Sequence, residues 1–163
     1  MEEIYKDIPG YEGDYQVSNM GNVKSLNYNH TNNEALLKQH PCKGGYLKVS
    51  LVKYGKRKNY KIHQLVAMAF LNHIPDGMNI IVNHIDNNNL NNCVDNLQLV
   101  SQRYNTSCHK TDVGITWEAS RSKWKAAIMI KGKNINLGRF KNKQDALDAY
   151  QKALKELDGK KRK

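Results

Sequence analysis

Two short apolar runs enclose an asparagine-rich stretch near the middle of the chain. Ile80-Ile81-Val82 comes first, residues 86–92 follow, and Leu97-Gln98-Leu99-Val100 closes the pattern. Short apolar runs bounded by turn-forming residues are typical of strands. Ser101 then stands where it can cap a helix. We therefore expect a strand–loop–strand–helix unit over this part of the chain.

A helical pattern precedes this unit. Apolar residues recur there at the spacing of one helix face: Ile62, Leu65, Val66, Ala69 and Phe70. Pro75-Asp76-Gly77 ends the pattern. Before the helix, turn signals break the chain into short strands, and a hairpin is expected over residues 46–60 with its turn at Tyr54-Gly55-Lys56.

The last third has a different pattern. Residues 115–117, 124–130 and 134–137 are expected to form three strands, with Lys131-Gly132 as a tight hairpin turn. Residues 143–157 carry an apolar helix face. The fold class expected for the whole chain is therefore α+β, with a small three-stranded sheet and one helix at the C-terminal end.

Positive charge is unevenly distributed along the 163 residues, whose formal net charge is +11. Residues 1–108 hold 11 Lys/Arg against 9 Asp/Glu, whereas residues 109–163 hold 15 against 6. This distribution favours a polyanion-binding module, following a linker at 110–112, attached to a nearly neutral part. The alternative is a solvated surface with a disordered basic tail at 160–163.

Cysteine usage and hydropathy exclude several classes. Cys42, Cys93 and Cys108 form no C-x-x-C pair, which argues against a disulfide framework and a cysteine zinc site. No apolar run reaches the ~20 residues of a membrane span, and the first residues lack signal-peptide features. We expect a cytoplasmic protein that does not bind membranes.

The central unit brings an imidazole close to several amide oxygens. A metal-dependent phosphodiesterase needs a base for the attacking water and a cation at the phosphate. His84 is the natural base, because imidazoles titrate near neutral pH. Asn83 and Asn105 can offer amide oxygens to Mg²⁺, and Asn96 can hydrogen-bond near His84 or fix its loop. The alternative is a buried histidine satisfied by loop amides.

Residues 82–105, VNHIDNNNLNNCVDNLQLVSQRYN, resemble the HNH motif of phage and intron-encoded homing endonucleases. The preceding IHQLVAMAFL matches the helix that leads into that motif. The resemblance covers residues 60–109 and implies a ββα-metal core, a divalent cation (Mg²⁺ or Mn²⁺), His84 as general base, Asn83 and Asn105 as metal ligands, and Asn96 as the orienting residue.

One position departs from the family pattern. Many HNH enzymes have an aspartate directly before the base, where this chain has Asn83. Asp86 can supply the missing charge, directly or through water; alternatively it is a turn residue of the loop. His109, one turn beyond Asn105, is a possible metal ligand or a residue next to the ligands; alternatively it lies at an exposed helix end.

Two flanking segments carry further resemblances. The opening IPGYEGDYQVSNMGNVKSL resembles the modular motif found upstream of HNH cores, which implies a strand-rich unit that grips DNA; structural turns around a small β core are the alternative. Residues 114–157 resemble the plant ethylene-response-factor (APETALA-type) DNA-binding domain, whose sheet lies in the major groove. Ile128 and Ile135 are then expected to face the helix, and Trp124 either the core or DNA.

Alternation along the C-terminal strands suggests which side chains face DNA. The candidates are Trp117, Arg121, Lys123, Lys125, Lys131, Lys133 and Arg139. Most of these are lysines or arginines, and the lysines are expected to contact phosphates, which gives affinity without sequence choice.

The sequence thus predicts modules at 1–58, 59–110 and 113–158 and a basic tail at 159–163. The expected function is that of a metal-dependent HNH endonuclease, of phage or mobile-element type, that nicks or cleaves double-stranded DNA. We expect a monomer without an obligate protein partner, since one chain carries binding and cutting parts. The alternative function is that of a catalytically inactive, sequence-specific DNA-binding regulator.

Overall fold

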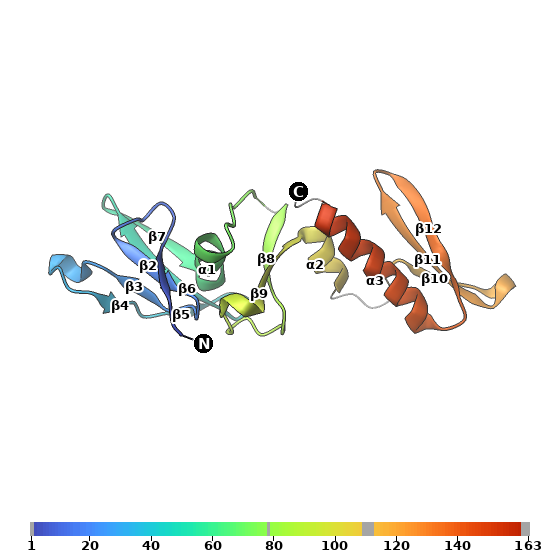
Figure 1. The fold of residues 1–163 in the computed structure, drawn as a ribbon, viewed down its shortest axis with the longest axis horizontal. Helices are drawn as coiled ribbons and strands as arrows, with labels where there is room; N and C mark the ends of the chain where they lie inside the picture. The colour runs from blue at the N-terminus through green and yellow to red at the C-terminus, as the bar shows by residue number, and fades with distance from the viewer. Residues whose placement is uncertain (1, 78, 109–112, 161–163) are drawn as a thin grey trace. The chain divides into compact units, whose positions relative to one another are not determined.

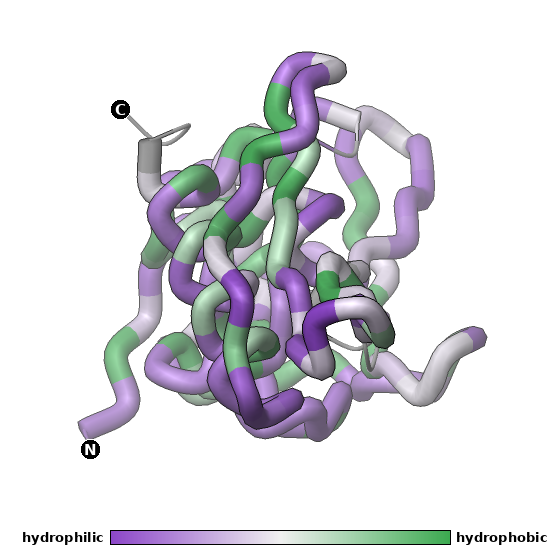
Figure 2. Tube along the Cα trace, turned by 90° about the vertical axis from the view of Figure 1, so that its right-hand side faces the viewer, coloured by the Kyte–Doolittle hydropathy of each residue, from purple (hydrophilic) through white to green (hydrophobic). Residues whose placement is uncertain are grey.

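The computed structural model describes residues 2–77, 79–108 and 113–160, which fold into two compact units, 1–99 and 100–163 (Figure 1). The fold is mixed α+β, as predicted. Along the chain, hydrophobic and hydrophilic residues alternate over short distances (Figure 2). Among the described residues, no helix is long and apolar enough to cross a membrane.

The first unit begins with two antiparallel sheets. One has the order β1-β2-β3-β4 and contains Tyr5–Asp7, Tyr15–Ser18, Val23–Ser25 and Ala35–Leu36, with a 3-10 turn at Tyr28–His30. The other has the order β5-β6-β7 and contains His40–Cys42, Tyr46–Lys53 and Lys56–Lys61. The predicted hairpin is confirmed: Tyr54 and Gly55 both have positive φ, the conformation of a tight two-residue turn.

The predicted central unit follows in order. Helix α1 is Ile62–Phe70, β8 is Ile80–His84, and β9 is Leu97–Ser101 after a 3-10 turn at Val94–Asn96. Strands β8 and β9 pair in a two-stranded sheet, and α2, Gln102–Cys108, follows directly. The predicted cap is also confirmed, because the Tyr104 amide donates to Ser101 Oγ at 3.1 Å.

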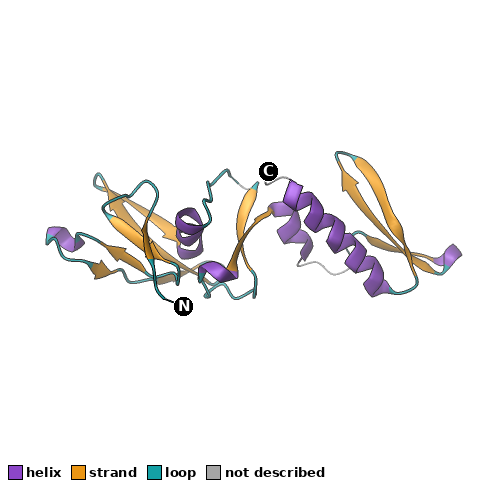
Figure 3. Ribbon diagram, in the orientation of Figure 1, coloured by secondary structure: helices purple, strands orange, loops and turns teal. Residues whose placement is uncertain are grey.

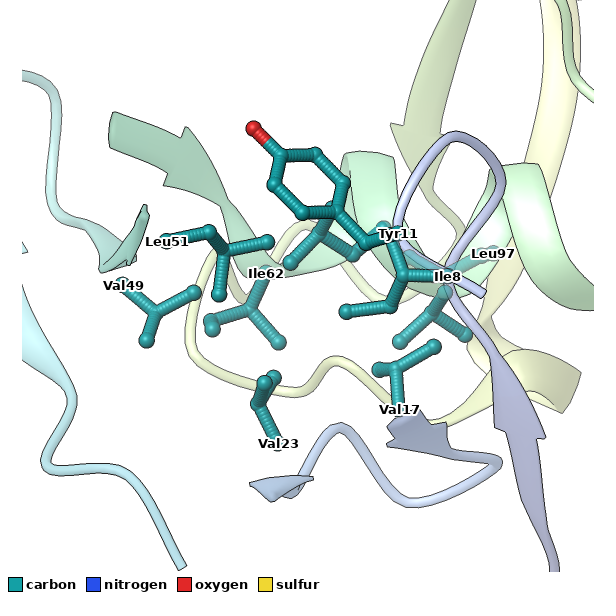
Figure 4. Close-up of a cluster of buried hydrophobic side chains, with 10 residues drawn as sticks. Ile8, Tyr11, Val17, Val23, Val49, Leu51, Ile62 and Leu97 are labelled. Carbon is teal, nitrogen blue, oxygen red and sulfur yellow. The ribbon is translucent and has the colours of Figure 1, made fainter. Parts of the chain in front are cut away.

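One hydrophobic core unites the first unit. It joins side chains from the N-terminal strands, from α1 and from β9: Ile8, Tyr11, Val17, Val23, Val49, Leu51, Ile62, Leu65, Val66 and Leu97. Figure 4 shows how Ile8, Val17, Val23, Leu51 and Leu97 lie around Ile62. The predicted helix face thus packs on the strands that precede it. The division at residue 58 stays a prediction, and the two segments on either side of it share this core.

The second unit is a three-stranded antiparallel sheet with a helix on one face (Figure 3). Its elements are β10 Ile115–Glu118, a 3-10 turn at Ala119–Arg121, β11 Lys123–Ile130, β12 Lys133–Phe140 and α3 Lys143–Lys160. The Lys131-Gly132 turn is confirmed, with both φ angles positive. Ile128 packs against Tyr150 and Leu154 of α3, as predicted.

Cross-strand register sorts the C-terminal side chains into two faces. Ile115 pairs with Ala126, and both pack towards α3. Trp117 is two residues beyond Ile115 and pairs with Trp124, whose ring packs against the same core. Trp117 therefore lies on the face towards α3, whereas Lys125 and Arg139 lie on the opposite face. Alternation along the strands had placed all three on the side facing DNA. Ile135 pairs with Ile128, on the face towards α3, but remains 43% exposed.

Candidate active site

His84 is the last residue of β8 and is only 3% exposed. Its Nε2 lies 3.3 Å from Oδ1 of Asn92, in the loop between β8 and β9. The amide nitrogen of Asn92 donates to the carbonyl of Leu90 at 3.2 Å, which leaves Oδ1 as the acceptor facing the imidazole. Nε2 is then the protonated nitrogen, and Nδ1 keeps its lone pair.

The N-terminal segment supports the loop that holds this imidazole. Gly21 has a φ of +89°, and a Cβ at that position would stand 2.8 Å from Cβ of Asn92. The Val94 amide donates to the carbonyl of Asn19 at 2.8 Å. Glycine is therefore required at position 21 both by its backbone conformation and by the close approach of Asn92. Sequence reasoning missed Asn92, which lies among several asparagines that look alike.

Asp86 and Asn96 organise the remainder of the loop. Asp86 Oδ1 accepts from the Asn88 amide at 2.8 Å and from Asn96 Nδ2 at 2.9 Å, and Asp86 Oδ2 accepts from Asn91 Nδ2 at 2.7 Å. The hydrogen bond from Asn91 is the largest of the effects that lower the Asp86 pKa. Asn96 Oδ1 in turn accepts from the Asp86 amide at 3.1 Å. Both side chains thus fix the loop that carries His84.

An aromatic cluster packs beside His84. The His63 ring lies edge-on to it, with centroids 5.0 Å apart, and Tyr46 lies 4.8 Å from His63 and 6.0 Å from His84. His63 is 5% exposed, and among the described residues its Nδ1 has no hydrogen-bond partner. Burial, followed by the charge of His84, lowers the pKa of His63 to about 3. His63 is therefore neutral at physiological pH.

The depressed pKa of His63 predicts a loss of stability in mild acid. In the unfolded chain, His63 binds a proton below its ordinary pKa of about 6.5. In the native protein, His63 stays unprotonated down to about pH 3. The free energy of unfolding should fall as pH drops through this window, by up to about 1.4 kcal/mol per pH unit from this group. His63→Phe should flatten the curve in urea unfolding between pH 7 and 4. Equal slopes for both proteins would contradict this assignment.

The candidate metal ligands lie in different units. Asn83 is half-buried on β8 in the first unit, and Asn105 lies on α2 in the second. Asn105 Oδ1 is buried without a hydrogen-bond partner among the described residues, and such an orphaned acceptor suits a hard cation. No cluster of three His, Cys, Asp or Glu side chains occurs within the described ranges. His109 lies outside the described residues.

The sheet β5-β7 of the first unit is strongly basic. Residues 35–75 contain eight Lys/Arg and no Asp/Glu. Lys48 and Lys61 stand directly opposite each other on β6 and β7, and Arg57 lies on the same face, opposite Val52. We call Lys48, Arg57 and Lys61 the basic face. Lys61 Nζ also lies 4.1 Å from the centroid of Tyr46, so this face adjoins the aromatic cluster.

The predicted DNA-contact residues occupy three places in the second unit. Lys123, Lys125 and Arg139 lie on the sheet face away from α3, with Arg121 in the adjoining 3-10 turn. Lys131 is in the hairpin turn, and Lys133 pairs with Ile130 at the strand end. Trp117 is 46% exposed on the side of Trp124, with ring centroids 5.3 Å apart.

Two family models match the first two thirds of the chain. Residues 3–52 match the NUMOD4 motif, and residues 60–107 match the model described as HNH endonuclease. The resemblances stated for these segments are thereby confirmed. The resemblance of residues 114–157 to the plant domain stays a prediction.

Similar proteins come from a phage and a prophage. The chain is 43% identical over 101 residues to "DNA endonuclease I-HmuI" of Bacillus phage SP01, across 62% of this chain and 54% of the relative. It is 48% identical over 58 residues, 36% of this chain and 32% of the relative, to "SPbeta prophage-derived putative HNH homing endonuclease YosQ" of Bacillus subtilis (strain 168). The chain thus spans about half of the first relative and a third of the second.

A solved structure shares the fold. It is described as "DNA binding and cleavage by the HNH homing endonuclease I-HmuI" and has a TM-score of 0.56 and 41% sequence identity. The match covers 66% of this chain and 57% of that one.

Proposed function

We propose that this chain is a metal-dependent endonuclease of the HNH homing type that hydrolyses phosphodiester bonds of double-stranded DNA. The observation that carries the proposal is the buried His84 at the end of β8, within the segment that matches the HNH endonuclease model. His84 Nδ1 takes the proton of the attacking water, while Nε2–H donates to Asn92. Asn92 therefore holds the imidazole in the tautomer that a general base requires.

Divalent metal chemistry completes the proposed site. Asn83 and Asn105 are the residues that would each offer an amide oxygen to Mg²⁺ or Mn²⁺, and the orphaned Oδ1 of Asn105 supports the role of Asn105. The bound cation would offset negative charge on the phosphate and on the departing oxygen. Asn96 positions the loop through Asp86. Asp86 accepts hydrogen bonds on both oxygens, which favours an organising role over direct ligation.

Both units contribute positive charge towards a DNA partner. The basic face of the first unit adjoins the cluster around His84, and the second unit adds the candidate contacts of its sheet. Phosphate contacts of this kind supply affinity that does not depend on sequence. We further propose that the protein acts as a monomer in the cytoplasm of a host cell.

A plasmid assay tests the activity. Supercoiled plasmid is incubated with the wild-type chain and Mg²⁺ or Mn²⁺, and an EDTA-treated sample serves as the control. Relaxed or linear DNA formed only with metal is the expected result. Tight DNA binding without nicking in either metal would contradict the proposal and favour the inactive regulator.

Lys48 provides a test of the basic face. Like charges directly opposite each other on paired strands destabilise a sheet, so Lys48→Gln should raise the free energy of unfolding by about 0.2–1 kcal/mol. The same change should weaken DNA binding and lower the slope of log affinity against log salt by about 0.9. Lys24, paired with Glu34 at 2.8 Å, is the matched control, and Lys24→Gln should change that slope less. Equal slopes for wild type and Lys48→Gln would contradict the assignment.

A further inference from the structure

A single carboxylate gathers cations on the sheet of the second unit. Arg139 Nε donates to Glu118 Oε2 at 2.7 Å, and Arg139 Nη2 donates to Oε1 at 3.4 Å. Lys125 Nζ lies 3.9 Å and Arg121 Nε 4.0 Å from the same carboxylate. The four residues come from β10, the 3-10 turn, β11 and β12, so Glu118 joins side chains across the whole sheet.

Register places this cluster on the face away from α3. Lys125 pairs with Thr116 on one side and with Arg139 on the other. Their neighbours Ile115 and Ala126 are buried towards α3, so alternate residues face away from the helix. We call this side the outer face, and it carries Thr116, Glu118, Lys123, Lys125, Ala127, Met129, Asn134, Asn136 and Arg139.

The Glu118 cluster contributes to fold stability, and it also fixes the orientation of Arg139. Ion pairs between partly exposed side chains contribute little to stability, because solvent screens them and both chains lose freedom. The side chains of Glu118 and Arg139 are 22% and 31% exposed, and they form a two-contact pair within a network, the arrangement in which such ion pairs contribute most. The hydrogen bond from Arg139 is the main cause of the lowered Glu118 pKa, so the carboxylate remains ionised. The Glu118 carboxylate thereby holds the flexible Arg139 side chain in one orientation.

An arginine held in this way suits one kind of partner. Two nitrogens of its planar guanidinium contact Glu118, and among the described residues the remaining N–H groups have no hydrogen-bond partner, so they can meet another pair of acceptors. In the major groove of DNA, guanine presents O6 and N7, which arginine contacts as a pair. A surface of unpaired lysines would instead favour phosphates of any sequence.

We propose that Glu118 is a positioning residue that determines base preference, by orienting Arg139 to contact guanine when duplex DNA lies on the outer face. The inference rests on the proposed DNA-binding function. Glu118 also repels phosphates, which lowers the affinity for unrelated sequences. Removing the Glu118 charge should therefore raise the affinity for unrelated sequences and lower the discrimination between sequences. Loss of an ordinary DNA contact would not produce both effects.

The test compares two substitutions that each remove one negative charge. Glu118→Gln breaks the cluster, whereas Glu156→Gln changes an exposed residue of α3. Full-length proteins select sequences from a random duplex pool, and affinities are then measured for the selected and a scrambled duplex. We expect Glu118→Gln to bind the scrambled duplex more tightly than wild type and to lose roughly tenfold in discrimination. Glu156→Gln should keep the wild-type preference.

Arg139→Lys completes a double-mutant cycle. Lysine keeps the positive charge but lacks the planar guanidinium that contacts two acceptors at once, so Arg139→Lys should lose the same guanine preference. Combining Arg139→Lys with Glu118→Gln should add no further loss of preference. Unchanged selectivity in Glu118→Gln would overturn the inference while leaving DNA binding intact. A wild-type chain that selects no sequence would overturn it too, and a chain that binds neither duplex would overturn the proposed DNA binding as well.

Discussion

Alanine at position 84 is expected to lower the rate constant of plasmid nicking by about 10²–10⁴-fold, the usual contribution of a general base. The change removes the only ring nitrogen that the Asn92 contact leaves ready to accept a proton. DNA affinity should stay close to that of wild type, because His84 is buried and is not one of the basic side chains expected to contact DNA phosphates. Single-turnover nicking with excess protein measures the rate, and filter binding in EDTA measures the affinity.

His40→Ala is the matched control for this prediction. His40 is an exposed histidine on β5 of the same unit, so its removal tests the generic cost of losing an imidazole. It should leave the nicking rate within a few-fold of wild type. Comparable losses in His40→Ala and His84→Ala would contradict the specific role of His84.

Asn105→Ala is expected to raise the Mg²⁺ concentration needed for half-maximal nicking by about 100-fold. Changes outside the direct ligands already cost 10–100-fold in metal affinity, and a direct ligand should cost at least as much. The amide oxygen is buried without a hydrogen-bond partner among the described residues, so the metal-free protein should lose little stability with it. Nicking is titrated with Mg²⁺, and urea unfolding is measured in EDTA.

Adding a charged ligand should have the opposite effect on the Mg²⁺ requirement. Asn83→Asp places a carboxylate directly before His84, and it should lower the Mg²⁺ requirement by about tenfold, since carboxylates bind hard cations better than amides. A metal requirement that Asn83→Asp and Asn105→Ala leave unchanged would contradict both ligand assignments.

Local patterns were enough to predict much of the fold. The apolar face beginning at Ile62, the two-residue turn at Lys131-Gly132 and the cap at Ser101 each depend on residues close in sequence. Such features are fixed by helical period, turn conformation and capping chemistry. His84 was identified because its position in the motif could be seen in the sequence.

Contacts between distant residues could not be predicted. Asn92 is distinguished from its neighbouring asparagines only by the imidazole of His84 and by the close approach of Gly21. The side on which Trp117 lies depends on which residue it faces across β11, and alternation within one strand does not supply that register. The basic face was hidden because charge averaged over residues 1–108 conceals a segment without acids.

We propose that the chain's own imidazole at position 84 acts as the base in metal-dependent cleavage of DNA. Replacing His84 by glycine removes the buried ring and leaves space in which free imidazole can act as the base. The decisive measurement is the nicking rate of His84→Gly in Mg²⁺ or Mn²⁺ as imidazole is added. We predict that the variant is nearly inactive alone and that its rate rises with imidazole, while the wild-type rate does not. A variant that nicks plasmid at the wild-type rate without imidazole would contradict the account.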